Sequence, residues 1–228
     1  DSRGLYSEGI QWLKRILATE GNVSLLDRAN VLNGAGGLAL KLSDDDSAKW
    51  YLTEALTVRK EAGDMPGVSG SLHNLAMLAI NQNDYKTALS RIEESLNVDR
   101  DLGDRAGVAS GTLVLAWILT VERQYESACT HTLQALATFQ ELNITPMIAH
   151  SLEMLGNISF WQEDYDQAHE YVSKGQALFQ SLGFASAALN VNHSLGNIAL
   201  SQQRVLEAEE LFTELLKGKM ETGDKTGI

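Results

Sequence analysis

The chain has 228 residues, of which 18 are Lys or Arg and 30 are Asp or Glu, so its formal net charge is −12. This acidic balance disfavours nucleic-acid binding, the single cysteine excludes a disulfide scaffold, and no apolar run reaches the ~20 residues of a membrane span. Because 44% of the residues are hydrophobic, we expect a folded, soluble and cytoplasmic protein.

The sequence matches itself when it is shifted by 40 residues, and periods of this length are typical of helical solenoids. An alanine recurs at the same place in every repeat, as Ala48, Ala88, Ala128, Ala168 and Ala208. The predicted organisation is a lone helix followed by five repeats without gaps, at 1–27, 28–67, 68–107, 108–147, 148–187 and 188–228.

The first segment, 1–27, has the spacing of the second half of a repeat. Its Tyr6, Gly9 and Leu13 are spaced like Tyr85, Ala88 and Ile92. Ile228 stands where a sixth repeat would begin, so we expect the sequence to be part of a longer array. Solenoids need polar capping repeats, and none is visible, which predicts end-to-end self-association through exposed terminal helices.

Each of the five repeats is predicted to hold two helices. Helix A covers about the first 14 residues, such as 68–81, and helix B runs from about Asp84 to Leu102. The repeats end on the residue types that stop a helix in the left-handed conformation, namely Gly63, Gly103, Asn143, Gly183 and Gly223. The Asp after three of these glycines, and Thr145 before Pro146, are predicted to cap the next helix A.

Small residues recur in helix A opposite the repeated alanines of helix B. They are Gly36, Ala76, Ala116, Gly156 and Gly196. Small residues on both helices allow two antiparallel helices to approach closely, so the pattern indicates an all-α protein of packed helix pairs. The run from Gly34 to Gly37 lies inside a helix A, where glycine costs stability, and this suggests close packing or the approach of a partner.

The second repeat carries Leu75, Asp84, Tyr85, Ala88 and Ile92, and the fifth carries Leu195, Gly196, Ala208 and Phe212, all at fixed offsets. This pattern resembles the tetratricopeptide repeat (TPR), in a 40-residue variant. The variant is similar to the MalT-like helical sensor arrays of bacterial signalling ATPases and transcription regulators, and also to eukaryotic adaptors and kinesin light chains. The resemblance implies a right-handed α-solenoid of about 11 helices.

In arrays of this family helix A lines a concave groove, which implies a partner-binding site here. Among residues 68–81, 108–121, 148–161 and 188–201 the only formal charge is Glu153. Asn side chains can bond both backbone groups of a peptide, and Trp and Met add apolar contact. The groove residues implied by the resemblance are Asn33, Gly37, His73, Asn74, Met77, Asn81, Leu113, Trp117, Thr120, Asn157, Phe160, Trp161, His193 and Asn197.

No residue pattern indicates catalysis, a cofactor or a metal site. The histidines lack metal-ligand spacing, Cys129 fits helix packing, and the acidic run that begins at Asp44 fits a capped turn. We therefore expect a non-catalytic module that binds a protein or peptide segment, with no cofactor, nucleic acid or membrane. The alternative is the ligand-sensing or autoregulatory arm of a multidomain signalling ATPase or transcription regulator, whose groove receives an inducer or domains of its own chain.

Overall fold

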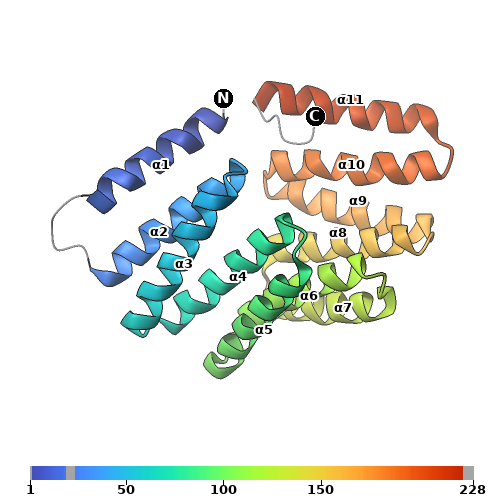
Figure 1. The fold of residues 1–228 in the computed structure, drawn as a ribbon. Coiled ribbons are helices and arrows are strands. Elements are labelled where there is room, and N and C mark those ends of the chain that lie inside the picture. The colour runs from blue at the N-terminus through green and yellow to red at the C-terminus, as the bar shows by residue number, and fades with distance from the viewer. Residues whose placement is uncertain (1, 19–23, 223–228) are drawn as a thin grey trace. The chain divides into compact units, whose positions relative to one another are not determined.

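The computed structural model describes residues 2–18 and 24–222, and the part it describes consists of helices joined by short turns, without strands (Figure 1). The eleven helices there are α1 (Ser2–Ala18), α2 (Leu25–Lys41), α3 (Asp45–Ala62), α4 (Met65–Asn81), α5 (Tyr85–Leu102), α6 (Arg105–Val121), α7 (Tyr125–Glu141), α8 (Thr145–Trp161), α9 (Tyr165–Ser181), α10 (Ala185–Ser201) and α11 (Val205–Thr222). Helices A of the five repeats are α2, α4, α6, α8 and α10, and each is followed by its helix B.

The predicted frame of the repeats is offset from the helices by one turn. Helices A begin at 25, 65, 105, 145 and 185, which is three residues before each expected boundary. The segment 1–27 is therefore not one helix, because its last residues already belong to α2, which Ser24 caps. The offset arises because the match of the sequence to itself defines a period but not the point at which a helix begins.

Most helix ends follow the predicted chemistry. The carboxylates of Asp44, Asp64 and Asp104 each accept a hydrogen bond from a backbone N–H in the first turn of the next helix, as predicted, and Asp224 lies outside the described residues. Asp84 and Asp164, which were not predicted as caps, do the same. Gly63, Gly103, Gly183 and Asn143 have positive φ, as predicted for a helix stop, and Gly223 lies outside the described residues.

One predicted cap is wrong. The residue before α8 is Ile144, which offers no side-chain hydrogen bond, and Thr145 is already helical. The helix begins at the same place in the repeat as its counterparts α4 and α6, which have Asp64 and Asp104 there, whereas α10 has Phe184 and, like α8, lacks a side-chain cap. Pro146 fits the first turn because an N–H there has no partner within the helix.

The turns between helix A and helix B lack the glycine that ends helix B, yet they also use the left-handed conformation. Ser43, Asn83, Arg123, Glu163 and Gln203 all have positive φ between 57° and 64°. The sequence predicts a short turn at this place, but not its left-handed residue, because no single residue type recurs there.

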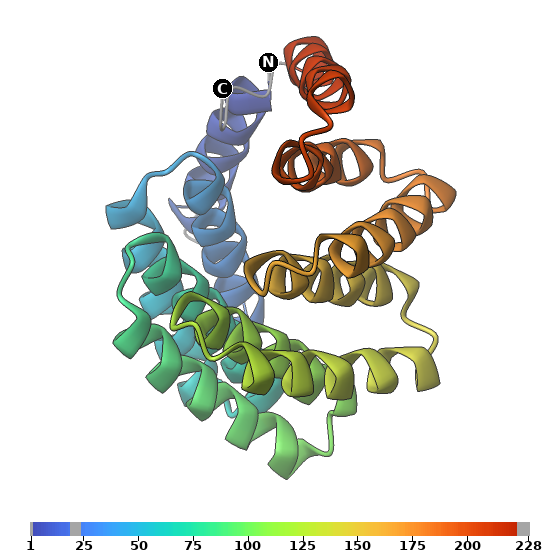
Figure 2. The same ribbon diagram turned by 90° about the vertical axis from the view of Figure 1, so that its right-hand side faces the viewer.

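The chain divides into two compact units, unit 1 (1–111) and unit 2 (112–228). In unit 1 each helix from α1 to α4 contacts the next, and α2 also contacts α4. In unit 2 the helices from α7 to α11 do the same, and α8 also contacts α10; Figure 2 shows α8 to α11 as successive elements of this unit.

Close contact between paired helices depends on the predicted small residues. A Cβ on Gly36 would lie 2.6 Å from Leu52, and one on Gly196 would lie 2.7 Å from Phe212. Ala48, Ala88 and Ala168 are fully buried. By contrast, a Cβ on Gly37 would meet no atom within 4 Å, so close packing explains Gly36 but not its neighbour.

No helix in the described ranges has the length and apolar character needed to cross a bilayer. Both α1 and α11 expose large apolar side chains, including Leu5, Trp12, Leu206 and Met220. End-to-end association through these two helices stays a prediction.

Candidate partner-binding surfaces

In unit 1 the predicted groove residues lie on α2 and α4, and a hydrogen bond joins the two helices. The amide nitrogen of Asn74 donates to Oδ1 of Asn33 at 3.0 Å. Met77 is 36% exposed and Asn81 is exposed, while Gly37 leaves open space beside the backbone. We call these six residues, Asn33, Gly37, His73, Asn74, Met77 and Asn81, the α2/α4 surface.

A buried arginine from helix B also joins α2 and α4, the two helices that carry this surface. Arg59 of α3 is 7% exposed and donates to the carbonyl of Gly67 (2.7 Å), to the hydroxyl of Ser71 (2.9 Å) and to Oδ1 of Asn30 (3.0 Å). A guanidinium can only donate, so it can bond only the oxygen of the Asn30 amide. The amide nitrogen of Asn30 is therefore directed away from Arg59. Sequence reasoning missed Asn30 because its partner lies 29 residues away.

His73 lies on the α2/α4 surface in an environment that changes its titration. Burial lowers the pKa of His73 below the usual range of a histidine, and the carboxylate of Asp99 on α5 acts in the opposite direction. Asp99 itself is 3% exposed. His73 is therefore held mostly neutral and half-buried, where it can accept or donate one hydrogen bond.

Among the predicted groove residues of unit 2, the most exposed side chains lie on α8 and α10. Trp161 is 58% exposed, and its ring meets the edge of Phe160 at 5.5 Å. Ser194 of α10 donates to Oδ1 of Asn157 of α8 at 3.3 Å, and Asn197 is bonded to His193 at 3.3 Å. We call Asn157, Trp161, His193 and Asn197 the α8/α10 surface.

Three predicted residues of unit 2 contribute less surface than expected. Leu113 is buried, and Thr120 is buried with its hydroxyl donating to the carbonyl of Ala116 at 2.8 Å. Phe160 packs against the apolar core of α8, α9 and α10. Leu113 and Thr120 are thus enclosed by the fold and Phe160 is partly enclosed, and their place in a partner-binding groove stays a prediction. Trp117 is half-buried.

A polar pair on α8 lies beside this surface. Oε2 of Glu153 is 3.6 Å from Nδ1 of His150, and the side chains are 28% and 52% exposed. The ring of His150 meets Phe179 edge-on at 4.8 Å. Sequence reasoning discounted His150 as a metal ligand and did not place it on the surface.

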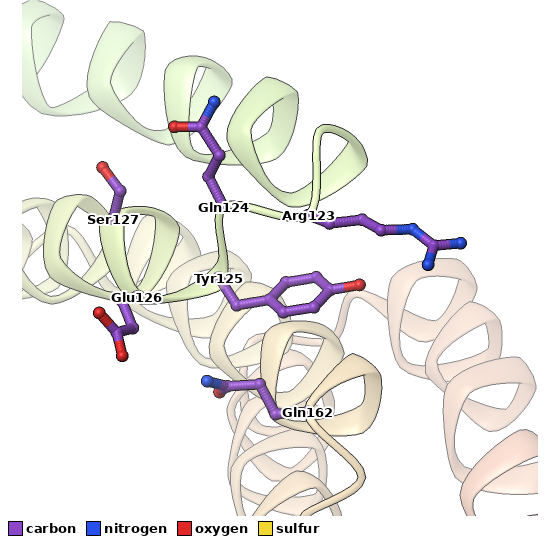
Figure 3. A pocket seen from close by; sticks show the side chains of 6 residues that line it. All are labelled: Arg123, Gln124, Tyr125, Glu126, Ser127 and Gln162. Carbon is purple, nitrogen blue, oxygen red and sulfur yellow. The ribbon is translucent and has the colours of Figure 1, made fainter.

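The structure also contains a pocket that no sequence pattern indicated. It measures about 470 Å³ and lies at the turn between α6 and α7 (Figure 3). Its walls mix a cation, a carboxylate and neutral polar groups, and they consist of Arg123, Gln124, Tyr125, Glu126, Ser127 and Gln162. The residue capping α7 is Gln124, whose side chain does not bond the helix. The pocket is wide open and lies at the turns, not on the faces of helices A.

The described residues contain no group of three or more His, Cys, Asp or Glu side chains placed to hold a metal ion. The acidic run at Asp44 to Asp46 caps and begins α3, as expected for a turn.

Comparison with known proteins supports the repeat and the fold. Residues 71–106 match the model of the tetratricopeptide repeat. None of the curated proteins matches the sequence.

Among solved structures with a similar fold is a Rap protein in complex with competence and sporulation factor, with 20% identity, a TM-score of 0.81, and coverage of 93% of this chain and 58% of that one. A second is NprR in complex with its cognate peptide NprX, with 17% identity, a TM-score of 0.76, and coverage of 94% and 62%.

A third is a signal transduction ATPase with numerous domains from Pyrococcus horikoshii, which has a tetratricopeptide repeat sensor. It shows 18% identity, a TM-score of 0.67, and coverage of 98% of this chain and 37% of that one. The chain thus spans less than two thirds of each of these three proteins. The matched segment and the shared fold confirm the resemblance predicted from the residues: the chain carries a tetratricopeptide repeat within an all-α, TPR-like solenoid of helix pairs.

Proposed function

We propose that this chain is a non-catalytic interaction module that binds a peptide segment of a partner protein on the exposed faces of its helices A. The observation that carries the proposal is the composition of the predicted groove positions. On α4, α8 and α10 these positions hold mainly Asn, His, Met and Trp, and α8 and α10 together hold one carboxylate and no Lys or Arg.

This composition suits a peptide because of its hydrogen-bonding capacity. An Asn side chain offers both a donor and an acceptor, so it can bond the N–H and C=O groups of an extended backbone. Trp161 offers a broad apolar face for one anchoring side chain. The Rap protein bound to competence and sporulation factor and NprR bound to its peptide NprX support the proposal, because their folds are similar to this one. We further propose that the module works in signalling in the cytoplasm.

The test is an affinity capture from a lysate of the native host, with the 228-residue chain as bait and mass spectrometry as readout. The variant Asn157→Ala/Trp161→Ala should lose the partner that the wild type retains. Trp50→Ala is the matched control, because Trp50 is 55% exposed and meets an aromatic neighbour edge-on, but belongs to a helix B. Retention of the same partner by the double variant would rule out the α8/α10 surface as the docking site.

A second candidate is the sensor arm of a larger signalling protein or transcription regulator. It is favoured by the similarity in fold to the ATPase with a tetratricopeptide repeat sensor. In that case the same surfaces would receive an inducer or other domains of the same polypeptide, and binding would shift an equilibrium between two states. Capture of no separate protein, together with thermal stabilisation by a low-molecular-weight lysate fraction, would favour this candidate.

A further inference from the structure

Beside the α8/α10 surface lies one fixed charge, the carboxylate of Glu153, which has no lysine or arginine partner among the described residues. Glu153 is the only Asp, Glu, Lys or Arg in α8, α10 and residues 112–121 of α6. In the described part of the chain its ion-pair contact is with His150, which is charged only when protonated. Its side chain is 28% exposed, so the carboxylate is partly removed from water and still accessible.

A partly buried carboxylate loses hydration that a cation can replace. A lysine or arginine would compensate for this loss and would form a charge-assisted hydrogen bond. Nothing on the surrounding helices A would repel such a cation, since Lys and Arg are absent from α8 and α10. A second acidic group would be repelled by Glu153. The local charge therefore favours a basic residue of the partner.

Two further groups follow Glu153 along the same face of α8. Residues 153, 157 and 161 are spaced four apart, and residues four apart lie on one face of a helix. Oδ1 of Asn157 accepts from Ser194, which leaves its amide nitrogen to donate to a carbonyl of the ligand. Trp161 is 58% exposed, and its position is held by Phe160, which packs into the core.

The spacing of these groups sets the spacing in the ligand. Eight helical residues at 1.5 Å each place Glu153 and Trp161 about 12 Å apart along α8. An extended peptide advances about 3.3 Å per residue, so about 12 Å corresponds to three or four residues.

We propose that α8 selects an extended peptide carrying a lysine or arginine for Glu153 and an apolar side chain for Trp161, three or four residues apart, with a backbone carbonyl between them bonded to Asn157. This inference rests on the proposed function and specifies its ligand.

The test is a selection from a phage-displayed library of random heptapeptides, with the immobilised 228-residue chain as target. The wild type should enrich a basic residue three or four positions from an apolar one. Glu153→Lys should instead enrich Asp or Glu at the same position. Glu163→Lys is the matched control, since Glu163 is exposed in the turn after α8 and should leave the selected motif unchanged.

Binding of a selected peptide, measured by fluorescence anisotropy, gives a second readout. Glu153→Gln keeps the shape of the side chain and should weaken binding by about tenfold or more. Trp161→Ala should weaken the same peptide, and Trp50→Ala should not. Circular dichroism of each variant checks that the helices are retained.

The possible failures are distinguishable. Selected peptides without a basic residue, or the same motif from wild type and Glu153→Lys, would overturn the role of Glu153 while leaving peptide binding intact. Failure of the wild type to enrich any motif would overturn both this inference and the proposed function.

Discussion

The two units bury different chemistry at the same position of the repeat. Near the end of helix B, unit 1 has Arg59 and Asp99, which are 7% and 3% exposed, whereas unit 2 has Phe139 and Phe179, which are 0% and 1% exposed. The four residues follow one another at intervals of 40 residues, so they occupy the same position of the repeat. The fold therefore requires that this position be filled and enclosed, but it does not require that the residue be apolar.

The side chains around this position explain why the fold accepts both a charged and an aromatic residue there. Arg59 donates hydrogen bonds to a carbonyl, a hydroxyl and an amide oxygen, and the carboxylate of Asp64, 3.6 Å from its Nε, supplies the opposite charge. Phe179 lies among apolar side chains and meets the ring of His150 edge-on. Unit 1 thus depends on hydrogen bonds of fixed geometry where unit 2 depends on apolar packing.

Removing the aromatic side chain in unit 2 should have the largest effect. Phe179→Ala should lower the free energy of unfolding by about 3–5 kcal/mol, because it leaves a cavity in the apolar core. Urea denaturation followed by circular dichroism measures the loss. The exposed neighbour provides the control, since Gln180→Ala should change stability by no more than about 0.5 kcal/mol. A loss below about 1 kcal/mol for Phe179→Ala would contradict the claim that unit 2 depends on apolar packing at this position.

Removing the charge of Arg59 in unit 1 should lower the free energy of unfolding by a smaller amount. Arg59→Met should destabilise by about 1–3 kcal/mol, because the buried hydroxyl of Ser71 and the Gly67 carbonyl lose their donor. The loss should overlap with that of Ser71→Ala in a double-mutant cycle. Lys60→Met serves as control, since its pair with Glu94 is exposed. An Arg59→Met chain as stable as the wild type would mean that apolar packing serves unit 1 equally well.

Replacing glycine by alanine should lower the stability of the chain at one helix A and raise it at another. In unit 2, Gly156→Ala should lose about 1–3 kcal/mol, because the new methyl group would overlap Cγ2 of Val172. In unit 1, Gly37→Ala should gain about 0.5–1 kcal/mol, because the site is open and alanine favours the helix. The melting temperatures of the two variants measure both effects, and a shift in the same direction for both would contradict the packing analysis.

Protonation of His73 in unit 1 should have the smallest effect on the free energy of unfolding. The pKa of His73 is lowered in the folded chain, so the unfolded chain takes up a proton first as the pH falls. The contribution of His73 is therefore fully present above its ordinary pKa of about 6.5 and declines as the pH falls below that value. His73→Gln should flatten this part of the stability profile in urea titrations at several pH values. An unchanged profile would show that His73 titrates as it does in the unfolded chain.

Much of the fold could be predicted because it depends on local chemistry. The helix stops at Gly63, Gly103 and Gly183 and the caps at Asp44, Asp64 and Asp104 follow from backbone conformation and hydrogen bonding within a few residues. The contact of Gly36 with Leu52 follows from the recurrence of small residues at one place in the repeat.

The candidate surfaces were only partly predictable, because exposure depends on residues far away in the sequence. The repeat placed Leu113 and Thr120 beside Trp161, but neighbouring helices bury the first two and leave the third exposed. Asn30 gained its orientation from Arg59, 29 residues away, and Asn157 gained its own from Ser194, 37 residues away.

The sequence by itself determined the period, the helix pairs and the near absence of charge on helices A, because each of these depends on residue type and spacing along one chain. Only the tertiary structure decided which polar groups face outward, which way their amides point, and that Glu153 meets His150 and no lysine or arginine of the described residues. The physical reason is that burial and hydrogen bonding at these sites are set by side chains from neighbouring helices, whose arrangement the periodicity alone does not specify.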